Sequence, residues 1–149
     1  MQQLFDAEMV CKTAKDTQNL ATNFAKLLPP NSSIALIGDL GTGKTTFVCG
    51  LAYGLGISDM VRSPSFNILN IYSSHVSLLH IDAYRLDGSK QATKALMLDD
   101  FLVPPYHVVV EWPERLHNFL ETCHFRVTFS MENNFSRTIY IQQIHRPSP

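Results

Sequence analysis

The sequence predicts an α/β protein, and two observations carry that prediction. A glycine-rich loop at Gly38–Thr45 fits the pattern G-x-x-x-x-G-K-[ST] and stands between a predicted strand and a predicted helix, the context that confirms a phosphate-binding P-loop. On both sides of this loop, short apolar runs of strand length alternate with segments of helical spacing.

The first predicted helix begins at Thr13, because Thr13 and Asp16 form a capping-box pattern. Apolar residues recur at helical spacing from Leu20 to Leu28, and Pro29-Pro30 ends the helix.

Ser33–Ile37 is short, apolar and partly branched, so it predicts a buried strand that leads directly into the glycine-rich loop. Thr45–Tyr53 is the predicted helix after the loop, with Gly54 and Gly56 as stop signals.

The remaining elements follow from alternation, turn residues and prolines. They are strands at 65–72 and 76–81 around Ser73-Ser74, a partial helix within 89–100, a buried strand at 107–110 after Pro104-Pro105, a short helix from Pro113 through Leu116 and Phe119, and an antiparallel hairpin of 125–131 with 138–144 that closes the domain.

The glycine-rich loop explains how a phosphate group would be bound. Glycines tolerate positive φ, so successive backbone N–H groups turn inward around one small concavity. The helix that follows adds unpaired N–H groups and the positive end of its dipole. Lys44 is expected to reach the β- and γ-phosphates, and the Thr45 hydroxyl is expected to bind Mg²⁺.

Hydrolysis needs an acid beside the loop, which helps to hold Mg²⁺ and to orient the attacking water. Two apolar strands end in such an acid: residues 78–81 lead to Asp82, and residues 108–110 lead to Glu111. We therefore expect Lys44, Asp82 and Glu111 to be the catalytic residues.

Composition limits the alternatives. A chain of 149 residues with 45% hydrophobic and 17% charged residues predicts one globular domain spanning residues 1–149. The net charge of −1 gives no electrostatic basis for tight, direct nucleic-acid binding. The three cysteines are far apart and predict neither a zinc site nor a disulfide framework, as expected for the cytoplasm. No apolar run predicts a signal peptide or membrane span, so we expect a cytoplasmic protein that contacts no membrane.

Four sequence blocks, in this order, resemble the bacterial TsaE (YjeE) ATPase family, which is needed for the threonylcarbamoyladenosine modification of tRNA. The resemblance spans roughly Thr13 to Leu116, and the blocks are Gly38–Phe47, Ser63–Phe66, His80–Leu86 and Val110–Glu114.

The resemblance implies a P-loop NTPase-like, three-layer fold with a mixed central sheet. It implies ATP as the nucleotide, Mg²⁺ held by Thr45 and Glu111, and the proteins TsaD and TsaB as partners, with tRNA engaged only through that complex. The family ATPase does not transfer the threonylcarbamoyl group; its ATP cycle is thought to reset the complex between turnovers. Expected nucleotide-binding residues are Thr13, Gly38, Asp39, Leu40, Gly41, Thr42, Gly43, Lys44, Thr45, Thr46, Ser65 and Trp112.

The chain departs from the family pattern at a few positions. Ser65 stands where the family loop has Thr, and Thr42 stands where Ala is usual. The segment 89–98 lacks the family's Glu-Glu-Leu and Leu-Gly patterns, which leaves that surface's partner contacts open. The sequence also leaves open whether His80 is catalytic, and whether Arg85 and Trp112 act at the nucleotide, at an interface or in the fold.

Two other functions share the P-loop. One is a small-molecule kinase, but the arginines are scattered and predict no lid over the phosphates. The other is a nucleotide-gated binding module with little hydrolysis, which only a turnover measurement separates from an ATPase.

Overall fold

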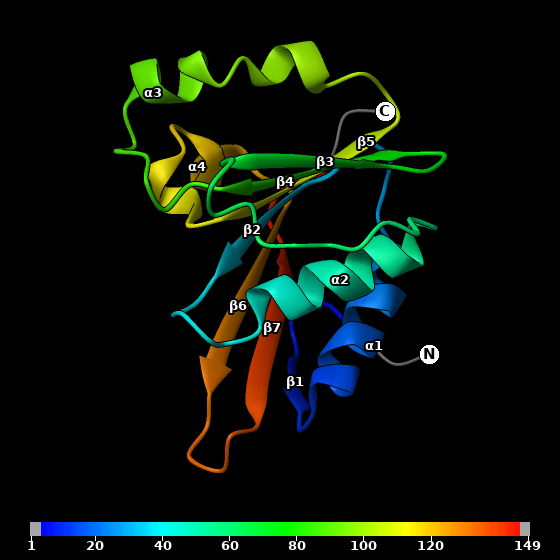
Figure 1. Cartoon of the computed structure of the whole chain (residues 1–149). Helices are drawn as coiled ribbons and strands as arrows, with labels where there is room; N and C mark the ends of the chain where they lie inside the picture. The colour runs from blue at the N-terminus through cyan, green and yellow to red at the C-terminus, as the bar shows by residue number, and fades with distance from the viewer. Residues whose placement is uncertain (1–3, 147–149) are drawn as a thin grey trace.

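The computed structural model describes residues 4–146, and within them seven strands form one mixed sheet (Figure 1). The strands lie in the order β1-β7-β6-β2-β5-β4-β3. Their bounds are β1 Glu8–Cys11, β2 Ser33–Ile37, β3 Leu69–Ser73, β4 Ser77–Asp82, β5 Tyr106–Glu111, β6 Phe125–Met131 and β7 Arg137–Gln143.

The four central strands β6, β2, β5 and β4 are parallel, so their carboxyl ends meet at one edge of the sheet. Both flanks are antiparallel: β3 pairs with β4, β7 pairs with β6, and β1 pairs with β7. Strands β2, β4 and β5 are buried almost throughout and are mostly apolar for that reason, whereas buried and partly exposed residues alternate along β6.

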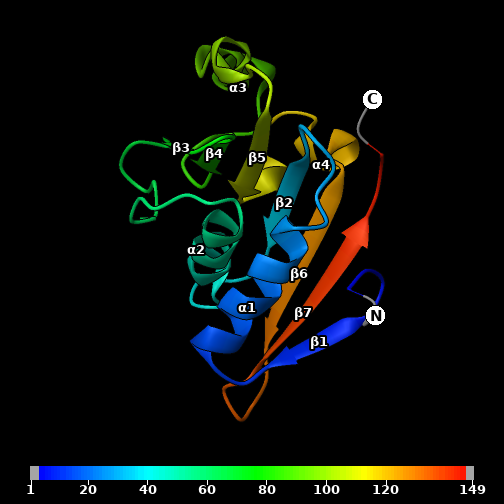
Figure 2. The same ribbon diagram turned by 90° about the vertical axis from the view of Figure 1, so that its right-hand side faces the viewer.

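Helices α1 (Ala14–Ala25) and α2 (Lys44–Gly54) lie side by side on one face of the sheet (Figure 2). The Thr13 hydroxyl accepts from Asp16 N at 3.1 Å, and the Asp16 carboxylate accepts from Thr13 N, which confirms the capping box. The two helices approach closely at Gly50, where a Cβ atom would lie 2.2 Å from the Gln18 carbonyl oxygen. The main hydrophobic core fills the space between these helices and the sheet.

Shorter elements cover the other face: α3 (Lys90–Ala95), the 3₁₀ helices η1 (Leu98–Phe101) and η2 (Pro113–Arg115), and α4 (Phe119–Thr122). A smaller apolar cluster lies beneath them and includes Leu79, Ile81, Val108, Val110 and Leu116. The sheet and its two coverings give the expected α/β fold of three layers.

Several predicted elements are confirmed, including the strand and helix that flank the glycine-rich loop and the C-terminal hairpin. Three local predictions were wrong. Residues 65–68 form turns rather than the start of a strand, and β3 begins only at Leu69. The helix expected from Pro113 through Phe119 is divided into η2 and α4 by Asn118 in the left-handed region. Strand β1 was not predicted at all.

Within residues 4–146, no helix combines the length and the apolar character that a membrane crossing requires.

Candidate functional site

The loop between β2 and α2 has the backbone geometry of a phosphate cradle. Gly41 and Gly43 have φ values of 79° and 96°, which residues with side chains adopt at a cost. Gly43 is also the N-cap of α2 and has no side chain to cap the helix, so the first N–H groups of α2 are left for another acceptor. Gly38 is required for space, since a Cβ atom there would lie 2.9 Å from the Thr42 hydroxyl oxygen.

Lys44 and Thr42 hold the loop together from inside. The Lys44 ammonium donates to the Gly38 carbonyl at 2.7 Å, and the Thr42 hydroxyl donates to the Asp39 carbonyl at 2.7 Å. Both side chains are buried. Thr42, the departure from the family's Ala, therefore contributes a hydrogen bond that alanine cannot make.

A pocket of about 320 Å³ opens above this loop and brings most of the sequence-predicted site residues together. Its walls are formed by Leu40, Gly41, Gly43, Lys44, Thr45, Thr46, Ser63, Ser65, Asp82, Glu111, Trp112 and Arg137. Gly38, Asp39 and Thr42 belong to the loop beneath but do not line this pocket. Thr13 does not line it either; its side chain caps α1.

The two acids stand side by side because β4 and β5 are adjacent and parallel, with Asp82 paired to Glu111 in the register. Asp82 is half-buried, and one of its carboxylate oxygens accepts from Tyr84 N at 3.0 Å. Glu111 is buried at the end of β5. A carboxylate buried this deeply needs a partner to offset its desolvation.

His80 is that partner. Its Nε2 lies 2.7 Å from a Glu111 carboxylate oxygen, the one ion-pair contact found within residues 4–146, and the ring is fully buried. His80 Nδ1 has no hydrogen-bond partner there. The histidine thus orients Glu111 from behind and does not line the pocket, which makes it a positioning residue.

Trp112 packs over the ammonium group of Lys44. Its ring centroid lies 4.5 Å from the Lys44 ammonium and 5.0 Å from the Tyr84 ring centroid. The Arg115 guanidinium stacks on Tyr84 at 4.8 Å and donates to the Tyr84 carbonyl. Trp112 therefore lines the pocket while it also packs against the smaller apolar cluster, and its cation–π contact helps to keep Lys44 in place.

Ser63 and Ser65 face the pocket from the loop before β3, with their hydroxyl oxygens 2.7 Å apart. Arg85 lines an adjoining hollow with Ser65 and Asp82, but it forms no ion pair with Asp82.

Arg137 is the pocket residue that sequence reasoning missed. It is the first residue of β7, and its guanidinium lies against Gly43. The sequence offered no local signal for it, because its position depends on the order of the strands.

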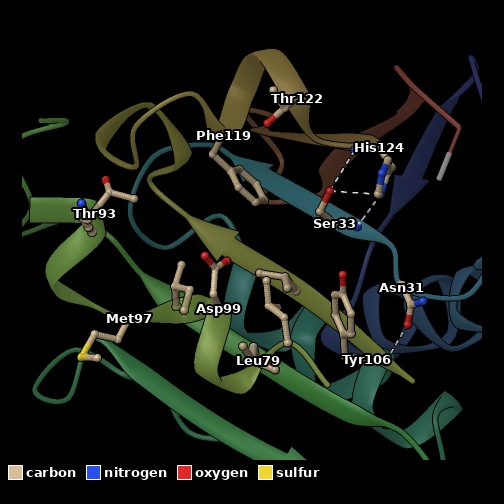
Figure 3. A pocket seen from close by; sticks show the side chains of 14 residues that line it. Asn31, Ser33, Leu79, Thr93, Met97, Asp99, Tyr106, Phe119, Thr122 and His124 are labelled. Carbon is tan, nitrogen blue, oxygen red and sulfur yellow. Dashed lines mark hydrogen bonds between the residues drawn. The ribbon is translucent and has the colours of Figure 1, made fainter. Parts of the chain in front are cut away.

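A second cavity, of about 370 Å³, lies on the far face of the sheet beneath α3, η1 and α4 (Figure 3). None of the predicted site residues lines it. Two of its polar side chains are engaged in hydrogen bonds: His124 Nδ1 accepts from Ser33 N at 2.9 Å, and Asn31 accepts from Tyr106 N at 3.1 Å. The chemistry is concentrated in the pocket above the glycine-rich loop.

Comparison with known proteins identifies the family of the chain. Residues 11–139 match the family described as threonylcarbamoyl adenosine biosynthesis protein TsaE. The tRNA threonylcarbamoyladenosine biosynthesis protein TsaE of Treponema pallidum is 36% identical over 122 residues, covering 82% of this chain and 88% of that protein. The protein of the same name from Aquifex aeolicus is 43% identical over 114 residues, covering 72% of this chain and 77% of that protein.

A solved structure agrees as well. The crystal structure of YdiB from Bacillus subtilis superposes with a TM-score of 0.75 at 26% identity, covering 97% of this chain and 90% of that one. The family match extends over most of the chain and includes the glycine-rich loop and both acids. The chain therefore belongs to the TsaE family of tRNA threonylcarbamoyladenosine biosynthesis proteins.

Proposed function

We propose that this protein binds ATP with Mg²⁺ and hydrolyses it slowly on its own, and that it works with TsaD and TsaB, resetting their complex between rounds of tRNA modification. The observation that carries the proposal is one pocket that joins the P-loop residues Lys44 and Thr45 to the acids Asp82 and Glu111.

The phosphate side of the proposal rests on the loop. Lys44 is buried and already aimed at the loop backbone, where it donates to Gly38, so its charge is pre-positioned for the β- and γ-phosphates. The uncapped first turn of α2 supplies N–H donors beside it.

The residues present fit a magnesium ion. Mg²⁺ is usually held by one or two protein oxygens together with substrate phosphates. Thr45 and Glu111 offer such oxygens from two walls of the pocket, and His80 keeps Glu111 oriented. Bound there, Mg²⁺ would neutralise part of the phosphate charge. Asp82, beside Glu111, would orient the attacking water.

Partner dependence rests on what surrounds the pocket. Leu40, Phe66 and Tyr84 line the adjoining hollow with exposed fractions of 78%, 92% and 48%. Exposed apolar side chains gathered at one place are typical of a protein contact. The net charge of −1 supports contact with tRNA only through the partner proteins.

Nucleotide binding is tested by titration calorimetry with ATP and Mg²⁺ on the parent protein, Lys44→Ala and the matched control Lys90→Ala. Lys90 is exposed on α3, far from the loop in sequence and on the other covering of the sheet. We expect Lys44→Ala to weaken ATP binding at least tenfold and Lys90→Ala to leave it unchanged. Equal affinities in all three proteins would contradict the assignment of Lys44 as a phosphate-binding residue.

Hydrolysis is tested with Glu111→Gln, which preserves shape and removes charge, against the control Glu114→Gln at an exposed position. We expect Mg²⁺-dependent turnover to be lost in Glu111→Gln alone.

The role in tRNA modification is tested by ATPase and modification assays with and without TsaD and TsaB. We expect faster turnover with both partners, and no modification with Asp82→Ala, while the exposed control Asp59→Ala behaves as the parent. Rapid phosphoryl transfer to a small-molecule acceptor without partners would favour a kinase instead.

A further inference from the structure

Arg137 is a second cation in the pocket, in addition to Lys44. Its Nε atom lies 2.9 Å from the position that a Cβ atom on Gly43 would occupy, so the side chain rests directly on the first turn of the P-loop helix. Arg137 lines the same pocket as Lys44 and Thr45.

The guanidinium has no partner among the described residues. Its Nε is buried without a hydrogen bond, and the ion-pair contact present within residues 4–146 does not involve it. Burial raises the pKa of the Cys11 thiol, which belongs to the residue paired with Arg137 between β1 and β7, so this neighbour is a neutral thiol rather than an anion. A buried N–H donor on a charged group costs free energy until an acceptor arrives.

The order of the strands places Arg137 opposite the acids. Asp82 and Glu111 end β4 and β5 on one side of β2, whereas Arg137 begins β7 on the other side, beyond β6. Because β7 is antiparallel to β6, its first residue lies at the edge where the central strands end. The pocket therefore has an acidic wall and a basic wall, with the glycine-rich loop between them.

The opposite charges of the two walls determine how a bound nucleotide would be oriented in the pocket. Mg²⁺ held by Thr45 and Glu111 would attract the outer phosphates to that side of the pocket. The inner phosphate and the nucleoside then extend toward the opposite wall.

We propose that Arg137 binds the α-phosphate of the nucleotide, as an anchor common to ATP and ADP and not as a contact to the transferred phosphate. The proposal rests on the nucleotide binding proposed above and goes beyond it by assigning the basic wall of the pocket.

The test is calorimetric titration of ATP and of ADP into the parent, Arg137→Gln, Arg137→Lys and Arg126→Gln. Arg126 is a matched control: it is also an arginine on the terminal hairpin with a buried, unpaired Nε, but it donates to the Leu120 carbonyl and does not line the pocket.

We expect Arg137→Gln to weaken ATP and ADP by the same factor, about tenfold or more, which is the loss typical of a charge-assisted hydrogen bond. Arg137→Lys keeps the charge without the planar fork and should lose less. Arg126→Gln should bind both nucleotides as the parent does.

Thermal unfolding without nucleotide separates binding from structure. Since Arg137 has no partner among residues 4–146, Arg137→Gln should unfold no more than about 2 °C below the parent. A large drop in unfolding temperature with unchanged nucleotide affinity would assign Arg137 to the fold and overturn the proposal. A loss confined to ATP would overturn it too, because the contact would then be to the γ-phosphate. If the parent bound neither nucleotide, the proposed function and this inference would fail together.

Discussion

Helices α1 and α2 cover one face of the sheet in close contact, whereas the short elements α3, η1, η2 and α4 cover the other face, where there is a cavity of about 370 Å³. On the first face, Gly50 brings α2 against the backbone of α1, and Thr22 of α1 donates to the Gly50 carbonyl at 2.9 Å. On the second face, none of the six residues of α3 is buried.

The covering by α1 and α2 is therefore the more rigid of the two, and the covering that includes α3 is the more adaptable. Helix α2, which follows the glycine-rich loop, belongs to the closely packed face, so the loop is anchored to the main core. The second covering includes α3, which has no buried residue, so packing constrains this helix less than α2.

The largest contrast should appear in native-state hydrogen exchange. Amides in the middle of α2 should exchange only through global unfolding, while those of α3 should exchange about a thousandfold faster or more, because a six-residue helix without buried side chains opens locally. Mass spectrometry of the two peptides checks this. Similar protection in both helices would show that the second face is as firmly packed as the first.

Gly50→Ala should cost about 3 kcal/mol of unfolding free energy, because the added methyl group would meet the Gln18 carbonyl and push the two helices apart. The control is Ala95→Val, which adds two methyl groups at an exposed position of α3 and should cost less than about 1 kcal/mol. Urea unfolding of both variants measures the difference. A small loss in Gly50→Ala would mean that the helices separate easily.

Two leucine truncations compare the coverings directly. Leu51→Ala removes a fully buried side chain of α2 and should cost about 3 kcal/mol. Leu98→Ala removes a half-buried side chain that already borders the cavity, so it should cost only about 1 kcal/mol. Equal losses, measured by urea unfolding, would contradict the contrast.

The smallest effect concerns pH. Burial lowers the pKa of His107, whose Nδ1 accepts from Ser32 N at 3.2 Å, below its ordinary value of 6.5. Below pH 6.5 the unfolded chain binds a proton that the folded chain does not, so this contribution to stability is complete above pH 6.5 and is lost as the pH falls. One such group changes the unfolding free energy by at most about 1.4 kcal/mol per pH unit.

Urea unfolding between pH 7.5 and 5.5 should show that loss, and His107→Asn should reduce it. His124 lines the cavity on the other face, and burial lowers its pKa as well. The variant His124→Asn therefore provides the comparison. An unchanged slope in His107→Asn would show that other groups cause the pH dependence.

The elements that could be predicted are those determined by residues close together in the sequence. The strand before the glycine-rich loop, the helix after it and the acids Asp82 and Glu111 at strand ends follow from short stretches of sequence. Their meeting in one pocket follows from the rule that parallel strands end at one edge.

The unpredicted part depends on neighbours that are distant in sequence. Strand β1 has only four residues of mixed polarity and exists through its pairing with β7. The contact of His80 with Glu111 depends on the register between β4 and β5, and the approach of Arg137 to Gly43 depends on the full strand order. Neither register nor strand order can be derived from periodicity.

The pairing of β1 with β7 also has a consequence for how the protein is made. Residues 8–11 leave the ribosome early, but their only strand partner, within the described chain, is residues 137–143, which are synthesised more than a hundred residues later. Contacts this distant in sequence are slow to form because a long loop must close first. The glycine-rich loop can thus fold during synthesis with its acidic wall, while its basic wall is added only when the terminal hairpin has emerged and closed the sheet.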